Sequence, residues 1–284
     1  MTDSLTSIEE MLGREARLFA ANNVDSDDKG HRTYIVADFE YEYQRAAHAG
    51  YRAAEGVGAE EKIRWPFHRI VAAAWTVLRF VPGQAVPEIE APIVLTAEVM
   101  GEKDIVTKFF DALAALPQAV VVSWGGEAKD LAALRRAAVE HDLALPLQLL
   151  ELSPHSLRRL DLCNTTSVQA ACVHLPEYAT ALSIPSKPSP SKAIGQLVEA
   201  REWDLVADQV VADVLTTSVI VIGQLKSMGV ITCDRPATIM ALADKAAETF
   251  PTSDFCSRSF KPWARDRLRA AGLRGTVFRA PDGR

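Results

Sequence analysis

Two acidic residues separated by one position, Asp38 and Glu40, are the first feature of the sequence that could do chemistry. They lie in the run 33–42, TYIVADFEYE, which is rich in β-branched and aromatic residues and therefore predicts a strand. Because side chains alternate along a strand, both carboxylates point to one face and Phe39 points to the other. Carboxylate oxygens at this spacing suit Mg²⁺ or Mn²⁺. The alternative is a solvated pair at a strand edge, since D-x-E also occurs by chance.

Two further acids occupy positions that could complete such a site. Asp130 follows the apolar run 119–124 and a Gly-Gly turn, where a buried strand passes into a helix. Ligands of open α/β sheets bind at this edge, although an acid at a helix N-terminus is also favoured by the macrodipole. Asp213 interrupts the apolar run 210–220, VVADVLTTSVI. If it is buried, Asp213 needs a metal ion or a Lys or Arg partner; otherwise it lies on a polar edge of its helix.

The elements that must position these acids form a mixed α/β pattern. Extended segments are predicted at 33–42, 68–78, 93–99 and 119–124, and helices at 5–22, 104–116, 128–139, 174–182, 192–202, 204–227 and 235–249. Three strands come in succession, and mostly helices follow the fourth. This order favours a mixed sheet flanked by helices over a regularly alternating doubly wound fold.

Composition narrows the class of protein. With 284 residues, 48% hydrophobic and 24% charged, the chain can form one large soluble domain or a domain with a small appendage. A formal charge of −6 argues against a protein that coats nucleic acid through its overall field. The four cysteines are scattered, which favours reduced thiols over zinc or disulfides. The N-terminus is not signal-like and the run 210–225 contains Asp213, so we expect a cytoplasmic protein with no membrane partner.

The order of these segments resembles that of the DEDD 3′–5′ exonucleases, in particular predicted exonucleases related to the proofreading domain of B-family DNA polymerases. The resemblance covers about residues 33–226 and includes the supporting segments WPFHRIV (65–71), VSWGGEAKDL (122–131) and LPEYATALSIPSK (175–187). It implies an RNase H-like α/β fold. It also implies metal-assisted hydrolysis of phosphodiester bonds at the 3′ ends of single-stranded nucleic acid, DNA or RNA.

The resemblance assigns a role to each acid. Asp38 and Glu40 match the first motif, Asp130 the second and Asp213 the third. In the family scheme two Mg²⁺ or Mn²⁺ ions ~4 Å apart activate the water and stabilise the leaving oxygen. Asp38 would bridge both ions, Glu40 and Asp213 would hold the ion that carries the attacking water, and Asp130 would position the second ion.

The sequence departs from the family pattern at the residue that handles this water. Four residues before Asp213 the family has Tyr or His, and here that position is Gln209, whose amide cannot accept a proton at neutral pH. Gly125 and Lys129 replace the usual Asn and Phe of the second motif. Either the metal ion alone activates the water, or Asp208 or a distant histidine substitutes, or the enzyme is slow. The alternatives are a catalytically impaired nucleic-acid-binding or scaffold protein, and a structural or regulatory protein whose acids form salt bridges.

Three parts of the chain are expected: an N-terminal helical segment at 1–30, the RNase H-like domain at 31–228 and a basic helical extension at 229–284. The arginine-rich end of the extension either forms a cationic surface for single-stranded nucleic acid or packs through Trp263 and Leu268 with its arginines exposed.

Three basic residues near the motifs have a structural or solvated alternative to a role in the site. His68 is predicted to be structural. Lys187 and Lys192 could contact phosphates, and a solvated loop is the simpler expectation for both.

Overall fold

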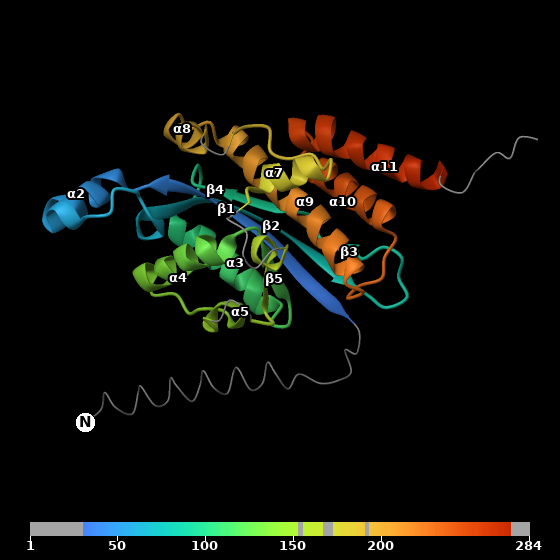
Figure 1. Cartoon of the computed structure of the whole chain (residues 1–284), viewed down its shortest axis with the longest axis horizontal. Coiled ribbons are helices and arrows are strands. Elements are labelled where there is room, and N and C mark those ends of the chain that lie inside the picture. The colour runs from blue at the N-terminus through green and yellow to red at the C-terminus, as the bar shows by residue number, and fades with distance from the viewer. Residues whose placement is uncertain (1–30, 153–155, 167–172, 191–192, 274–284) are drawn as a thin grey trace, which may run out of the picture.

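A computed structural model describes residues 31–152, 156–166, 173–190 and 193–273 (Figure 1). The expected helix at 5–22 and the segment 1–30 lie outside the described residues. Lys192 and the end of the basic extension, 274–284, lie outside them as well.

The centre of the protein is a mixed β-sheet with the strand order β3-β2-β1-β5-β6, and β4 also pairs with β2. The strands are β1 (Arg32–Tyr43), β2 (His68–Phe80), β3 (Glu88–Ile89), β4 (Ile93–Thr96), β5 (Val120–Ser123) and β6 (Arg159–Asp161). Strands β1 and β2 are long and antiparallel, whereas β5 runs parallel to β1 and β6 runs parallel to β5. This mixed sheet with flanking helices confirms the predicted RNase H-like architecture.

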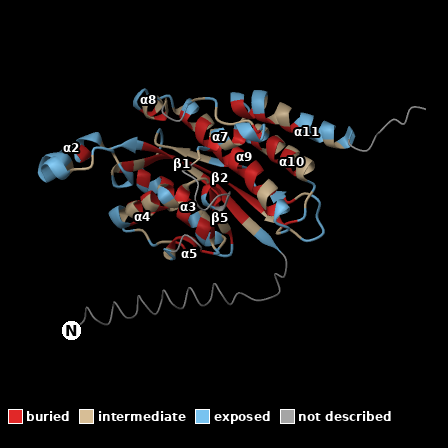
Figure 2. Ribbon diagram, viewed as in Figure 1, coloured by how far each residue is buried: buried red, intermediate tan, exposed pale blue. Residues whose placement is uncertain are grey.

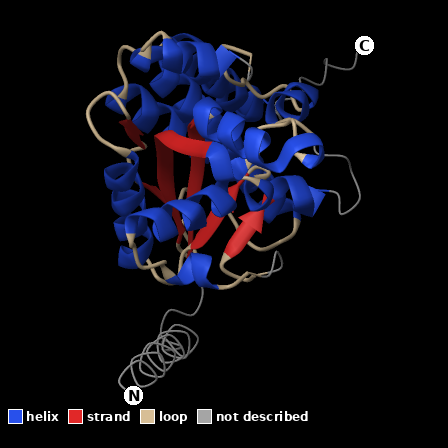
Figure 3. Ribbon diagram, turned by 90° about the vertical axis from the view of Figure 1, so that its left-hand side faces the viewer, coloured by secondary structure: helices blue, strands red, loops and turns tan. Residues whose placement is uncertain are grey.

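Helices cover both faces of the sheet, which makes three layers (Figures 1 and 3). One face carries α3 (Glu102–Ala115), α4 (Asp130–His141) and α5 (Leu147–Leu150). The other carries α6 (Leu162–Thr166), α7 (Leu175–Ala181), α8 (Ile194–Glu199), α9 (Trp203–Ser227), α10 (Arg235–Thr249) and α11 (Lys261–Leu273), with a π-helical turn at Phe255–Phe260. The C-terminal helices α10 and α11 share the hydrophobic core of α9.

Most residues of β1 and β2 are buried (Figure 2). The alternation of side chains along β1 divides the core between the two faces of the sheet. Tyr34 and Val36 pack toward α9, whereas Ile35 and Phe39 pack toward α3 and α4. Because every second side chain shares a face, Asp38 and Glu40 both point to the α9 side. The prediction that the two acids share a face is therefore confirmed.

Helix α9 is the longest helix of the structure, with 25 residues. By length and composition the helix could cross a membrane, since its apolar 18-residue stretch has a mean hydropathy of 1.8. However, 83% of that stretch is buried inside the protein. The prediction of a buried core helix at this position is therefore confirmed.

Several elements differ from the predicted ones. Two elements were not predicted from the sequence: α2 (Arg45–Glu55), which projects from one end of the molecule (Figure 1), and the three-residue strand β6. The strand expected at 93–99 ends at Thr96, where a turn begins. Helix α4 begins at Asp130 rather than at 128, because a 3₁₀ turn at Gly126–Ala128 precedes it.

Candidate metal centre

Three carboxylates meet between the central strand and the core helix. Asp38 and Glu40 of β1 and Asp213 of α9 each place an oxygen within 4.8 Å of the other two. Glu40 and Asp213 are buried, while Asp38 is partly exposed. Carboxylate oxygens are hard donors of the kind that Mg²⁺ and Mn²⁺ prefer.

Asp130 lies beside this group at the first residue of α4. It is buried, and its Oδ1 accepts a hydrogen bond of 2.6 Å from the hydroxyl of Tyr41. The ammonium of Lys129 lies 4.0 Å from the centre of the Tyr41 ring. Asp130 is not within the 4.8 Å group, although its charge acts on Asp38 and Glu40.

The Gly-Gly turn between β5 and α4 places Asp130. Gly125 has φ of +74°, in the left-handed region that favours glycine. A Cβ on Gly126 would lie 2.3 Å from Oγ of Ser123, so only glycine fits there without a shift of the strand. Asp161 of β6 accepts hydrogen bonds from the amides of Gly125 and Glu127 at 2.8 and 3.1 Å. Asp161 was not predicted, because nothing in the short β6 segment indicates that it faces this turn.

Lys187 lies inside the acidic group. Its Nζ is 2.7 Å from Oδ2 of Asp213, and its side chain is only 10% exposed. The loop is held there by buried Ile184 and by a hydrogen bond of 2.8 Å from Oγ1 of Thr216 to the carbonyl of Pro185. The expectation that Lys187 belongs to a solvated loop was therefore wrong, since this loop packs on α9.

The pairing of Asp213 with Lys187 leaves part of that carboxylate unsatisfied. Within the described residues, Oδ1 of Asp213 is buried and has no hydrogen-bond partner. A buried carboxylate oxygen without a partner is costly unless a cation or water contacts it. Asp213 thus combines both sequence-based alternatives: it forms a buried salt bridge, and its second oxygen is available as a metal ligand.

The electrostatics of the group follow from burial and mutual repulsion. Burial, followed by the charges of Asp213 and Glu40, raises the pKa of Asp38 well above its usual value. Burial and the charge of Asp213 raise the pKa of Glu40 to about 7, although Lys187 and Lys129 act in the opposite direction. Burial also raises the pKa of Asp213.

The charges of the site suit a divalent cation. Asp38, Glu40, Asp130 and Asp213 carry four negative charges when ionised. The lysines at 129 and 187, whose charges lower carboxylate pKa values in this group, offset two of them. The oxygen donors, the unsatisfied Oδ1 and the remaining negative charge all fit Mg²⁺ or Mn²⁺.

Gln209 occupies the position where the family has its water-handling residue. It is fully buried in α9, and neither atom of its amide has a hydrogen-bond partner in the part of the chain that the structure describes. Asp208 does not stand in for it, because its carboxylate accepts hydrogen bonds from Ser253 and from the amide of Phe255. These bonds attach the C-terminal helices to α9.

His68 has the structural surroundings that the sequence predicted. Its Nε2 lies 3.2 Å from the carbonyl of Ile63, and its ring packs against Tyr41 and Tyr43. Burial lowers the pKa of His68 to about 4, so the ring is neutral near neutral pH.

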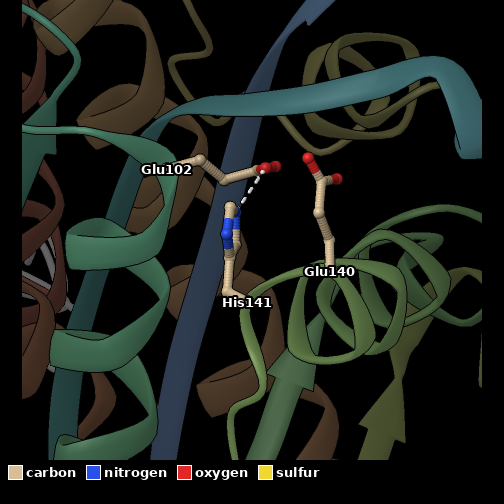
Figure 4. A group of neighbouring side chains, drawn as sticks. All are labelled: Glu102, Glu140 and His141. Atoms are coloured by element: carbon tan, nitrogen blue, oxygen red, sulfur yellow. Dashed lines mark hydrogen bonds and ion pairs between the residues drawn. The ribbon is translucent and has the colours of Figure 1, made fainter.

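A second group of possible ligands, which the sequence analysis did not predict, lies on the opposite side of the sheet. Glu102, Glu140 and His141 place their ligand atoms within 4.8 Å of one another (Figure 4). Arg136 pairs with both glutamates, and Arg69 pairs with them at 3.4 and 2.6 Å. Because two guanidinium groups already neutralise the carboxylates, this group is a salt-bridge network that ties α3 and α4 to β2.

The basic helix α11 packs on the domain through Trp263, whose Nε1 donates to the carbonyl of Ser183 at 2.7 Å. Leu268 was expected to pack as well, but it is 38% exposed. Arg265 and Arg269 are also exposed. Of the two residues that were expected to pack the helix on the domain, Trp263 therefore does so and Leu268 does not.

No protein-family model matches the chain, and no curated protein matches it. Among solved structures, E. coli exonuclease I in complex with a dT13 oligonucleotide has a TM-score of 0.42 and 12% identity, covering 69% of this chain and 41% of that one. The family B DNA polymerase of Pyrobaculum calidifontis has a TM-score of 0.44 and 15% identity, covering 84% of this chain and 29% of the polymerase. The chain spans less than half the length of either protein.

Proposed function

We propose that the protein is a divalent-metal-dependent 3′–5′ exonuclease that hydrolyses phosphodiester bonds at the 3′ ends of single-stranded nucleic acid. The observation that carries this proposal is the group of Asp38, Glu40 and Asp213, whose oxygens lie within 4.8 Å of one another with Asp130 beside them. These are the four residues that the DEDD motifs place in the site.

The burial of each acid suggests its role. Asp38 is partly exposed and would face both the metal ions and the substrate, whereas buried Glu40 and Asp213 would hold one ion from the inside. Asp130, oriented by Tyr41, would hold the other ion. When bound, Mg²⁺ or Mn²⁺ lowers the pKa of a water and stabilises the leaving oxygen.

Charge balance separates the roles of the two ions. After the two lysines are counted, the ionised acids leave two negative charges, which one divalent ion offsets. The phosphate of a substrate supplies the further negative charge that a second ion needs. We therefore expect one tightly held ion in the free protein and the second only with nucleic acid.

A second candidate is a nucleic-acid-binding protein with the same fold and little catalysis. Full burial of Gln209 favours this alternative, because an amide without access to solvent is poorly placed to orient an attacking water. Lys187 also favours it, since its ammonium must leave Asp213 before that carboxylate can bind a metal ion with both oxygens.

Incubation of the full chain with 5′-labelled single-stranded DNA and RNA in Mn²⁺ tests the proposal. The wild type is expected to produce a ladder of products shortened from the 3′ end, and Asp38→Asn and Asp213→Asn are expected to abolish it. Glu42→Gln is the matched control, because Glu42 lies on the same strand but is exposed. Intact oligonucleotides with the wild type would exclude the exonuclease.

The outcome for Gln209 distinguishes the two candidates. Gln209→His introduces a base of similar volume one helical turn from Asp213. An increase in turnover would show that the site lacks only a proton acceptor. If the wild type and this variant bind single-stranded nucleic acid but neither cleaves it, the binding protein is the better description.

A further inference from the structure

A hollow of about 360 Å³ lies between α10, α11 and the loop that follows α7. Its walls include the apolar side chains of Leu182, Ile184 and Ile239 and the guanidinium groups of Arg235 and Arg267. The volume and the mixture of apolar walls with a few polar groups are typical of small-molecule sites.

Arg235 lines this hollow without a counter-charge. Its Nε is buried and lacks a hydrogen-bond partner, and no described carboxylate lies within ion-pair distance of its guanidinium. A Cβ on Gly223 would lie 2.9 Å from Nη2 of Arg235, so glycine at this position lets the guanidinium lie against α9. A half-buried arginine with no acid beside it is costly, which indicates that an anion is its missing partner.

Arg267 adds a second positive charge to the same hollow. It lies 5.5 Å from the Trp263 ring and donates to the carbonyl of Ser183 at 3.2 Å. Among the described residues no acid pairs with it, and its charge acts directly on Arg235. Ser183 has φ of +55°, and the two hydrogen bonds from α11 to its carbonyl hold the loop in this conformation. The wall of the hollow is thus held in place by α11.

We propose that this hollow binds a small organic anion: a carboxylate or phosphate monoester on an apolar body the size of one or two rings. Arg235 and Arg267 both line the hollow, and a planar guanidinium provides paired donors for an oxyanion. The aliphatic wall of Leu182, Ile184 and Ile239 covers the apolar body. The site lies outside the acidic group and is independent of the proposed nuclease activity.

Calorimetric titration of the full chain tests the proposal with three ligands of one shape: 1-naphthoate, 1-naphthyl phosphate and the neutral 1-naphthamide. The two anions are expected to bind with one site per chain and at least tenfold more tightly than the amide. The tighter of the two anions identifies the headgroup. Inorganic phosphate alone is expected to bind more weakly than the ester, because it leaves the apolar wall unoccupied.

Two variants locate the site. Arg235→Met keeps much of the apolar stem and is expected to weaken binding of the anions about tenfold or more. Arg258→Met is the matched control, since Arg258 is exposed and pairs with Asp254. Ala271→Glu places a carboxylate at the rim of the hollow and is expected to abolish binding even if Arg235→Met folds poorly. Asp213→Asn is expected to bind the anions as the wild type does.

Either of two results would overturn the proposal. One is equal affinity for the amide and the anions, which would mean that the arginines do not select the ligand. The other is that the wild type, Arg235→Met and Ala271→Glu do not differ, whether all three bind the anions equally tightly or none of them binds.

Discussion

Nζ of Lys187 lies 2.7 Å from Oδ2 of Asp213, within the group that Asp213 forms with Asp38 and Glu40. The ammonium therefore occupies part of the space in which a divalent cation would neutralise the same carboxylates. Lys187 and a metal ion would contact the same group of carboxylates, and their competition for these oxygens affects how tightly the site binds metal.

Lys187→Met is expected to destabilise the metal-free protein by about 3 kcal/mol, because it leaves the buried carboxylate of Asp213 without its cation. The same variant is expected to bind Mn²⁺ several-fold more tightly, since no ammonium competes for the oxygens. Thermal unfolding with EDTA and with Mn²⁺ measures both effects. Lys245→Met, at an exposed lysine 3.9 Å from Glu248, serves as the control. Unchanged stability and Mn²⁺ affinity would contradict the competition.

The pKa of Glu40 predicts a pH dependence of stability without metal. Because the pKa is about 7 in the folded protein and about 4.5 in a free glutamate, the folded state holds more protons between these values. The free energy of unfolding therefore falls as pH rises from about 4.5 to about 7. Glu40→Gln has no carboxyl group that ionises at this position, so its free energy of unfolding should not fall for this reason. At about pH 8 the variant should therefore be more stable than the wild type, by roughly 3 kcal/mol at most.

The difference between Glu40→Gln and the wild type is the quantity to measure, by urea unfolding in EDTA across this pH range. The difference removes the contribution of groups on which Glu40 does not act, such as His68. Glu42→Gln, exposed on the same strand, should follow the wild type. A difference that does not change with pH would refute the raised pKa.

Tyr41→Phe tests the link between β1 and the second motif. Removal of the hydroxyl leaves Oδ1 of buried Asp130 without its 2.6 Å hydrogen bond, which should cost about 1–3 kcal/mol of stability. It should also weaken Mn²⁺ binding, because Asp130 loses its orientation. Tyr51→Phe removes a longer, 3.2 Å hydrogen bond with the amide of Glu60 and should have a smaller effect. Equal effects of the two variants would mean that Tyr41 does not position Asp130.

Glu102→Gln tests whether the acidic group on the opposite side of the sheet is structural. Glu102 is buried and joins Arg69, Arg136 and the amide of Ile70, so the variant should lose about 3 kcal/mol of stability. Glu140→Gln should lose less, since the side chain of Glu140 is 37% exposed. The stabilisation by Mn²⁺ should equal that of the wild type in both variants. Loss of Mn²⁺ stabilisation in Glu102→Gln would instead identify a metal site there.

The fold and most of the acidic group could be predicted because their signals are local. The alternation in β1 determined that Asp38 and Glu40 share a face, and the apolar run around Asp213 predicted a buried helix. Helix α2 was missed because its segment contains Gly50 and no large aliphatic residue, so nothing in it indicated a face that packs on a core. Strand β6 was missed because three residues are too few to show a period.

By itself the sequence determined which side chains share a face of a strand or helix and which acids could meet, because side-chain periodicity follows from the backbone geometry of a strand or helix. The tertiary structure decided which residues contact those acids and the turn that positions Asp130. Lys187 reaches Asp213 only because its loop packs on α9, and Asp161 reaches the Gly-Gly turn only because β6 pairs with β5. Such contacts depend on how segments far apart in the chain pack together. No local pattern of residues indicates which distant segments become neighbours.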